Sequence, residues 1–116
     1  MKAKIKVTSD FNSAVYGPVL GRIRVSLGLT AKQLSEISGI SVSTISAFEI
    51  GNRNMSVILA AKLLSALDMS EDCFKALSRY HAQKSIDLLT AHKEDPVVQI
   101  ILLQDVQREK LGLKLV

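Results

Sequence analysis

The amino-acid sequence predicts an all-α protein, built as a five-helix domain followed by a C-terminal helical extension. Apolar residues recur three or four positions apart through most of the chain. Serine or threonine precedes several of these apolar segments, and glycine follows several, as at the two ends of a helix. Only residues 2–7 and 111–115 alternate polar and apolar, so the termini are expected to be either short β-strands or frayed lysine-rich ends.

Capping residues set the expected helix bounds. The first helix is expected to begin at Gly17-Pro18, because a proline at the first helical position loses no hydrogen bond. Thr30, Ser41 and Ser70 stand at the N-caps of the second, third and fifth helices. The apolar stripe of the fifth loses phase before Ile86, so that segment is either one bent helix or two helices. The expected bounds are 17–27, 31–38, 42–50, 56–67, 71–91 and 97–110.

The core is expected to be aliphatic, because aromatic residues make up only 4% of the chain. On the second helix we expect Leu34 and Ile37 to point inward, and on the fourth Ile58 and Leu63. The single cysteine, Cys73, excludes an intramolecular disulfide and is expected to be a small buried apolar side chain.

Composition and charge narrow the function classes. No apolar run reaches the roughly 18 residues that span a bilayer, and the first residues lack the apolar stretch of a signal peptide, so we expect a cytoplasmic protein. The net charge is +4, and residues 1–70 carry all of the excess, with eight basic and four acidic side chains against seven of each in residues 71–116. The N-terminal part is therefore the part expected to meet a polyanion.

No arrangement of residues indicates catalysis or metal binding. The histidines, His81 and His92, are not grouped with other ligand residues. Ser43, Thr44 and Glu49 are explained by helix capping and ion pairing. We therefore expect no enzyme activity, no cofactor and no metal.

The most informative segment lies between residues 27 and 54. It reads G-L-T-x-x-x-L-x-x-x-x-G-I-S-x-S-T-I-S-x-x-E-x-G from Gly28 to Gly51, and a loop of basic and amide residues follows. Two short helices around a tight turn leave the start of the second exposed, which is the geometry that lays a helix in the major groove. This segment resembles the lambda-repressor-like Cro/repressor family, or XRE family, and the resemblance continues through residues 64–70.

The resemblance implies a double-stranded DNA partner and assigns roles to individual residues. Arg24 and Glu49 correspond to a buried ion pair between the first and third helices, and a buried carboxylate without such a partner would be costly. The residues implied to face base edges are Val42, Ser43, Ser46 and Ala47. Those implied to contact phosphates are Lys32, Ser41, Thr44, Asn52, Arg53 and Asn54.

The segment departs from the family pattern where bases are read. Base-reading positions in the family often hold Gln, Arg, Lys or Asn, whereas this chain offers only valine, serine and alanine. Bidentate readout, worth about 1–3 kcal/mol per base pair, is therefore absent, and hydroxyl hydrogen bonds, thymine-methyl contacts and DNA shape remain. Ala31 also replaces a common phosphate-clamping Gln, and Met55 replaces the usual Pro. We expect weak binding per monomer and hence a homodimer.

The C-terminal segment is the candidate dimerisation element. The apolar face of residues 97–106 is broad for a helix with one side in water, so it either forms a local hairpin with residues 71–91 or closes a two-fold interface. The residues expected to dimerise are Val97, Val98, Ile101 and Leu102. The expected division of the chain is an arm over 1–16, a DNA-binding domain over 17–70 that extends to about 80, and an extension over 81–116.

Three functions are compatible with this pattern. The leading hypothesis is a sequence-specific transcriptional regulator, most simply a repressor acting as a homodimer on a pseudo-palindromic operator. A second is the antitoxin of a toxin–antitoxin pair, in which residues 71–116 wrap a toxin. A third is a protein-interaction module that has lost DNA binding. None of them involves a membrane.

Overall fold

The computed structural model describes residues 11–110, with side chains through residue 107. The all-α class is confirmed, and the strands considered for residues 2–7 and 111–115 lie outside the described part. No helix within it is long and apolar enough to cross a membrane. The helices are α1 (Ser13–Ser26), α2 (Ala31–Ser38), α3 (Val42–Glu49), α4 (Val57–Ala66), α5 (Glu71–Gln83), the 3-10 helix η1 (Ile86–His92) and α6 (Pro96–Lys110).

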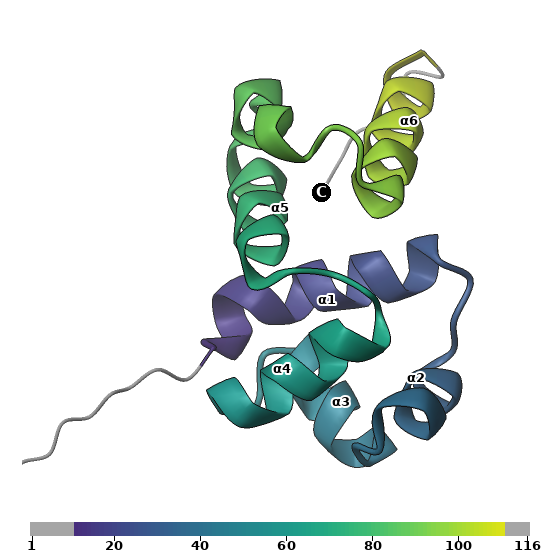
Figure 1. Cartoon of the computed structure of the whole chain (residues 1–116), viewed down its shortest axis with the longest axis vertical. Coiled ribbons are helices and arrows are strands. Elements are labelled where there is room, and N and C mark those ends of the chain that lie inside the picture. Colours follow the sequence, from purple (N-terminus) through teal and green to yellow (C-terminus); the bar gives the residue numbers. More distant parts are fainter. Residues whose placement is uncertain (1–10, 111–116) are drawn as a thin grey trace, which may run out of the picture.

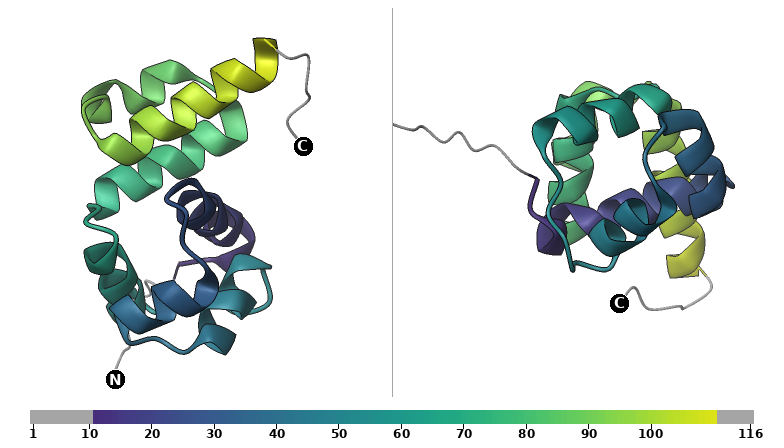
Figure 2. Two further views of the ribbon diagram at one scale, coloured as in Figure 1. Left: turned by 90° about the vertical axis from the view of Figure 1, so that its right-hand side faces the viewer. Right: turned by 90° about the horizontal axis from the view of Figure 1, so that it is seen from below.

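The helices gather at two ends of an elongated molecule measuring 55 × 30 × 25 Å. Figure 1 shows α2, α3 and α4 at one end, α5, η1 and α6 at the other, and α1 crossing between them. Figure 2 shows the same arrangement from two further sides; η1 packs on α5, and α6 packs on α1. Because α1 packs on α3 as well as on α5 and α6, it is the element that both ends share.

The first helix begins four residues earlier than the sequence predicted, inside the expected N-terminal arm. The Asn12 side chain caps it by accepting a hydrogen bond from the Ala14 amide at 2.8 Å. Just before the cap, Phe11 exchanges two backbone hydrogen bonds with Met55, at 2.7 and 3.1 Å, which holds the chain in place for the helix start. Pro18 therefore lies inside α1 rather than opening it.

Two predicted core residues are on the surface. Ile37 on α2 is 55% exposed and Ile58 on α4 is 73% exposed. The core face of α4 is instead formed by Ala60, Leu63 and Leu64. Apolar residues of α4 occur on nearly all sides of the helix, so their spacing alone could not show which face packs inward.

Aromatic side chains contribute more to the core than their number suggested. The rings of Phe11 and Phe74 lie 5.8 Å apart, and Tyr16 packs edge-on to Phe11 at 5.0 Å. Next to this cluster, Cys73 is buried as predicted. Burial and the nearby Asp95 carboxylate raise the pKa of the Cys73 thiol to about 12, so it stays protonated and unreactive at neutral pH.

A buried carboxylate joins the extension to α1. Asp105 on α6 is 5% exposed, accepts a hydrogen bond from the Tyr80 hydroxyl at 2.7 Å, and forms an ion pair with Arg22 on α1. Burial alone would raise the pKa of Asp105, but the hydrogen bonds from Tyr80 and Arg22 outweigh it and lower that pKa. Beside this pair, Ser26 donates a hydrogen bond to Gln104 at 3.0 Å. The extension is thus fixed to α1 by polar contacts as well as by packing.

The residues expected to dimerise are mostly buried within the chain. Val97, Val98 and Ile101 are 5%, 0% and 2% exposed, and Leu102 packs partly against the same core. Of the two arrangements considered for the extension, packing within the chain is present, mainly on α1, and a two-fold interface stays a prediction. The dimerisation role assigned to Val97, Val98 and Ile101 is therefore corrected, because these side chains are buried inside one chain, and that of Leu102 stays a prediction.

We predict that Asp105→Asn lowers the free energy of unfolding by about 2–4 kcal/mol, because it leaves the half-buried Arg22 guanidinium without its charge partner. Urea denaturation at neutral pH measures this loss, and Asp87→Asn on the exposed surface of η1 is the matched control. The lowered pKa of Asp105 means that its contribution is complete at neutral pH and is lost as the pH falls below about 4. The variant should therefore lose less stability than the wild type on acidification, and an unchanged acid profile would contradict this role.

Candidate nucleic-acid interface

Two adjacent caps produce the tight connection between α2 and α3. At the start of α2, the Thr30 hydroxyl accepts a hydrogen bond from the Gln33 amide at 3.0 Å, and the Gln33 side chain accepts one from the Thr30 amide at 2.8 Å. Gly39 ends α2 with φ of 78°, a conformation that glycine adopts without strain. Two residues later Ser41 caps α3 by accepting from the Thr44 amide at 3.2 Å. The predicted helix, turn and helix are therefore present.

The inner face of this unit is anchored and its outer face is open. Leu34 and Ile45 are both 0% exposed, and Phe48 is 2% exposed. On the opposite side of α3, Val42 is 40% exposed and Ser43 is exposed. Figure 1 shows α3 at the end of the molecule away from α5 and α6, so the chain's described C-terminal extension does not cover it.

The four side chains implied to face base edges are accessible to different degrees. Val42 and Ser43, in the first turn of α3, are exposed, whereas Ser46 and Ala47 are half-buried. The first turn of α3 is thus the part of the helix that a duplex would meet most directly.

The side chains implied to contact phosphates fall into two groups. Lys32, Asn52 and Arg53 are exposed. Ser41 and Asn54 are exposed too, but together with the half-buried Thr44 they take part in local hydrogen bonds. The Ser41 hydroxyl donates to that of Thr44 at 2.9 Å, and the Asn54 side-chain oxygen accepts from the Ser13 amide at 2.9 Å.

An ion pair fixes α3 to α1, as the resemblance implied. The Arg24 guanidinium donates to both carboxylate oxygens of Glu49, at 2.8 and 2.9 Å, and also to the Leu29 carbonyl at 2.7 Å. The hydrogen bond to Glu49 raises the pKa of Arg24 despite the opposing effect of burial. Because its donors point inward, Arg24 positions α3 rather than meeting a phosphate.

A second determinant of the α1–α3 contact was not predicted from the sequence. A Cβ atom added at Gly17 would lie only 2.0 Å from the Phe48 carbonyl oxygen, so the two helices approach closely at this point. One turn along α1, a Cβ at Gly21 would lie 3.3 Å from a carboxylate oxygen of Glu49. Two glycines four residues apart in a helical segment were the available signal, because they mark a helix face that a backbone can approach.

The arrangement defines a helix-turn-helix domain of the DNA-binding kind. Residues 20–72 match the family model described as Helix-turn-helix, and this part of the chain belongs to the Cro/C1-type family, also called the XRE family. No curated protein and no solved structure matches the chain. The match begins within α1 and ends in the first turn of α5, so η1 and α6 lie beyond it. The chain is accordingly a DNA-binding, helix-turn-helix transcription regulator.

We predict that Gly17→Ala destabilises the fold by about 2–3 kcal/mol, because the added methyl group collides with backbone that cannot move without shifting α3. Gly21→Ala is the matched control, since it adds the same group to the same helix against a side chain. Thermal unfolding of both variants checks this. Equal melting temperatures would show that the close approach at Gly17 does not matter.

Proposed function

We propose that this regulator is a sequence-specific repressor that acts as a homodimer on a pseudo-palindromic operator. The observation that carries the proposal is the open first turn of α3, held outward by Ile45 and Phe48 in the core. A helix supported in this way fits the major groove. Repression is the simplest consequence, because a bound dimer blocks access to the promoter. A cytoplasmic location is part of the same proposal.

Base recognition is proposed to rely on Val42, Ser43, Ser46 and Ala47. Serine hydroxyls bond to several bases, and the valine and alanine methyl groups suit the thymine methyl. None of these side chains makes the bidentate contact that discriminates most strongly between bases. DNA shape and deformability must therefore supply part of the specificity.

Phosphate binding is proposed to rest first on Lys32, Asn52 and Arg53, whose side chains are exposed. Lys32 is in the first turn of α2, and Arg53 follows α3, so one cation precedes α3 in the sequence and the other follows it. Ser41 and Thr44 would add hydroxyl groups where α3 begins. Asn54 would contribute only through its amide nitrogen while its oxygen holds the start of α1.

A homodimer is proposed because one reading helix of this composition gives little discrimination. Two copies joined to each other bind two half-sites with an affinity well above that of either alone. Pseudo-palindromic operators follow from the two-fold symmetry of such a dimer. The antitoxin alternative is not pursued, since α6 directs its main apolar face into its own chain.

Arg53→Ala should weaken binding to all DNA sequences alike and reduce the slope of log K against log salt by about one, because one phosphate contact is lost. The measurement is fluorescence anisotropy over a salt series, with an operator selected from a random library and with unselected DNA. Arg79→Ala is the control, because Arg79 is also an exposed arginine and lies on α5, away from α3.

A changed sequence preference with an unchanged slope would contradict the phosphate role of Arg53. Failure of the wild type to select any sequence, with no loss of affinity as salt rises, would overturn the proposed function itself.

A further inference from the structure

We propose that His81 makes the docking of α6 on α1 sensitive to mild acid, so that this contact weakens as the solution is acidified from neutral pH. The inference goes beyond the proposed function and does not depend on it. His81 is half-buried on α5. The residue before it, Tyr80, donates to Asp105 of α6, and Asp105 pairs with Arg22 of α1. His81 therefore stands beside the polar contact that joins the three helices.

One ring nitrogen of His81 is placed where a proton is unfavourable. Its Nδ1 atom is buried and has no hydrogen-bond partner in the part of the chain that the structure describes. The Asp105 carboxylate already accepts from Arg22 through one oxygen and from Tyr80 through the other. A neutral imidazole can carry its single proton on Nε2, whereas the charged ring must carry one on Nδ1 as well. Protonation in the docked structure would thus bury a donor without an acceptor, which is costly.

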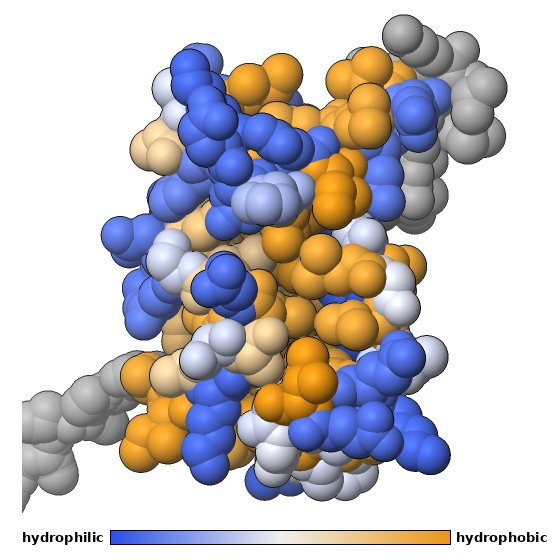
Figure 3. Space-filling view, turned by 45° about the vertical axis from the view of Figure 1, so that its right-hand side comes forward, coloured by the Kyte–Doolittle hydropathy of each residue, from blue (hydrophilic) through white to orange (hydrophobic). Residues whose placement is uncertain are grey.

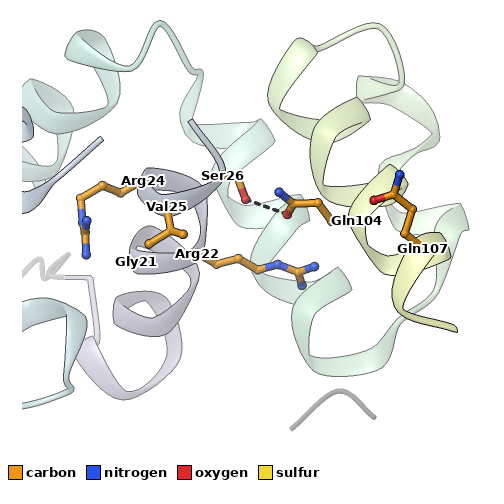
Figure 4. A pocket seen from close by; sticks show the side chains of 7 residues that line it. All are labelled: Gly21, Arg22, Arg24, Val25, Ser26, Gln104 and Gln107. Atoms are coloured by element: carbon orange, nitrogen blue, oxygen red, sulfur yellow. Dashed lines mark hydrogen bonds between the residues drawn. The ribbon is translucent and has the colours of Figure 1, made fainter. Parts of the chain in front are cut away.

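The charges around the ring act in the same direction. Burial, Lys84 and Arg22 lower the pKa of His81, and the Asp105 carboxylate opposes them only in part. Figure 4 shows the Arg22 side chain extending from α1 towards α6. Helices η1 and α4 also pack on α5, but their ionisable side chains are not among the charges that shift this pKa: Asp87, His92 and Lys62.

The junction between α1 and α6 is also incompletely packed. A hollow of about 550 Å³ lies between the two helices and is lined by residues of both, among them Arg22 and Gln104 (Figure 4). The polar contacts beside it are the Arg22–Asp105 pair and the hydrogen bond from Ser26 to Gln104. Helices that enclose such a hollow separate more easily than a closely packed core does. Movement of α6 away from α1 would open the surroundings of His81 to water.

The direction of the pKa shift gives the sign of the effect. A histidine in water takes up its proton as the pH falls through about 6.5, whereas docked His81 stays neutral to a lower pH. The opened state therefore binds more protons in this range, and docking loses stability until the pH falls below the lowered pKa. With a docked ring that stays neutral, the ratio of opened to docked molecules rises about tenfold between about pH 7.5 and 5.5, which is the upper limit.

The test is amide hydrogen exchange of the full chain at about pH 7.5 and 5.5, corrected for the intrinsic exchange rate at each pH. The opening constant of the α6 amides should rise severalfold at the lower pH. His81→Gln cannot be protonated and should remove most of this rise, whatever it does to stability at neutral pH. His92→Gln is the matched control, since His92 is also half-buried but lies on η1, and it should keep the rise.

A hydrophobic dye gives a second readout. Val97, Val98 and Ile101 are buried, so opening of α6 makes them accessible and should increase dye fluorescence at the lower pH in the wild type but not in His81→Gln. Figure 3 shows hydrophobic side chains already on the surface at the end of the molecule that holds α6, where Leu103 and Val106 are exposed. The quantity to compare is therefore the change with pH and not the binding itself.

The NMR titration of the His81 ring in the wild type needs no variant, and its midpoint is expected below about 6.5. A midpoint at or above that of a histidine in the denatured chain overturns the inference. So does an equal pH dependence of α6 opening in the wild type and His81→Gln, or its loss in His92→Gln alone. None of these measurements involves DNA, so their outcome is independent of whether the chain proves to be a repressor.

Discussion

The close contact between α1 and α3 is the constraint on which the rest of the structure depends. Gly17 lets the backbones approach, and the Arg24–Glu49 pair fixes the two helices relative to each other. Since the guanidinium also binds the Leu29 carbonyl, the same side chain holds the segment that leads into α2. The outward position of the first turn of α3 follows from this contact, because Ile45 and Phe48 on the opposite side of the helix are buried.

Helix α1 also connects the end of the molecule that holds α3 to the C-terminal extension. Arg22 and Arg24 are two residues apart, so they leave α1 in directions that differ by about 200°. One binds Asp105 on α6 and the other binds Glu49 on α3. Each arginine is half-buried and paired, so movement of α6 or α3 away from α1 would leave a charge without its partner. The position of α6 relative to α3 is therefore fixed within the chain.

The features that were predictable from sequence are local ones. The Thr30 and Ser41 caps and the turn at Gly39 depend on residues within a few positions, and the structure contains all three. The start of α1 was missed because it depends on Phe11 pairing with Met55, 44 residues away along the chain. The Asp105 contact likewise joins distant segments. No periodicity indicates such pairs, because the spacing of residues within one segment carries no information about a partner in a distant segment.

The breadth of the apolar surface on α6 shows why the sequence pattern was ambiguous. A single wide face suggested dimerisation through residues such as Ile101, yet Val97, Val98 and Ile101 fill the core of their own chain. Leu103 and Val106, which are 58% and 46% exposed, project from other sides of the helix. The wide apolar surface predicted for α6 therefore consists of two parts. One part is buried in the core of the chain, and the other is exposed. The spacing of apolar residues could not separate the two, because only the tertiary contacts with α1 decide which of them become buried.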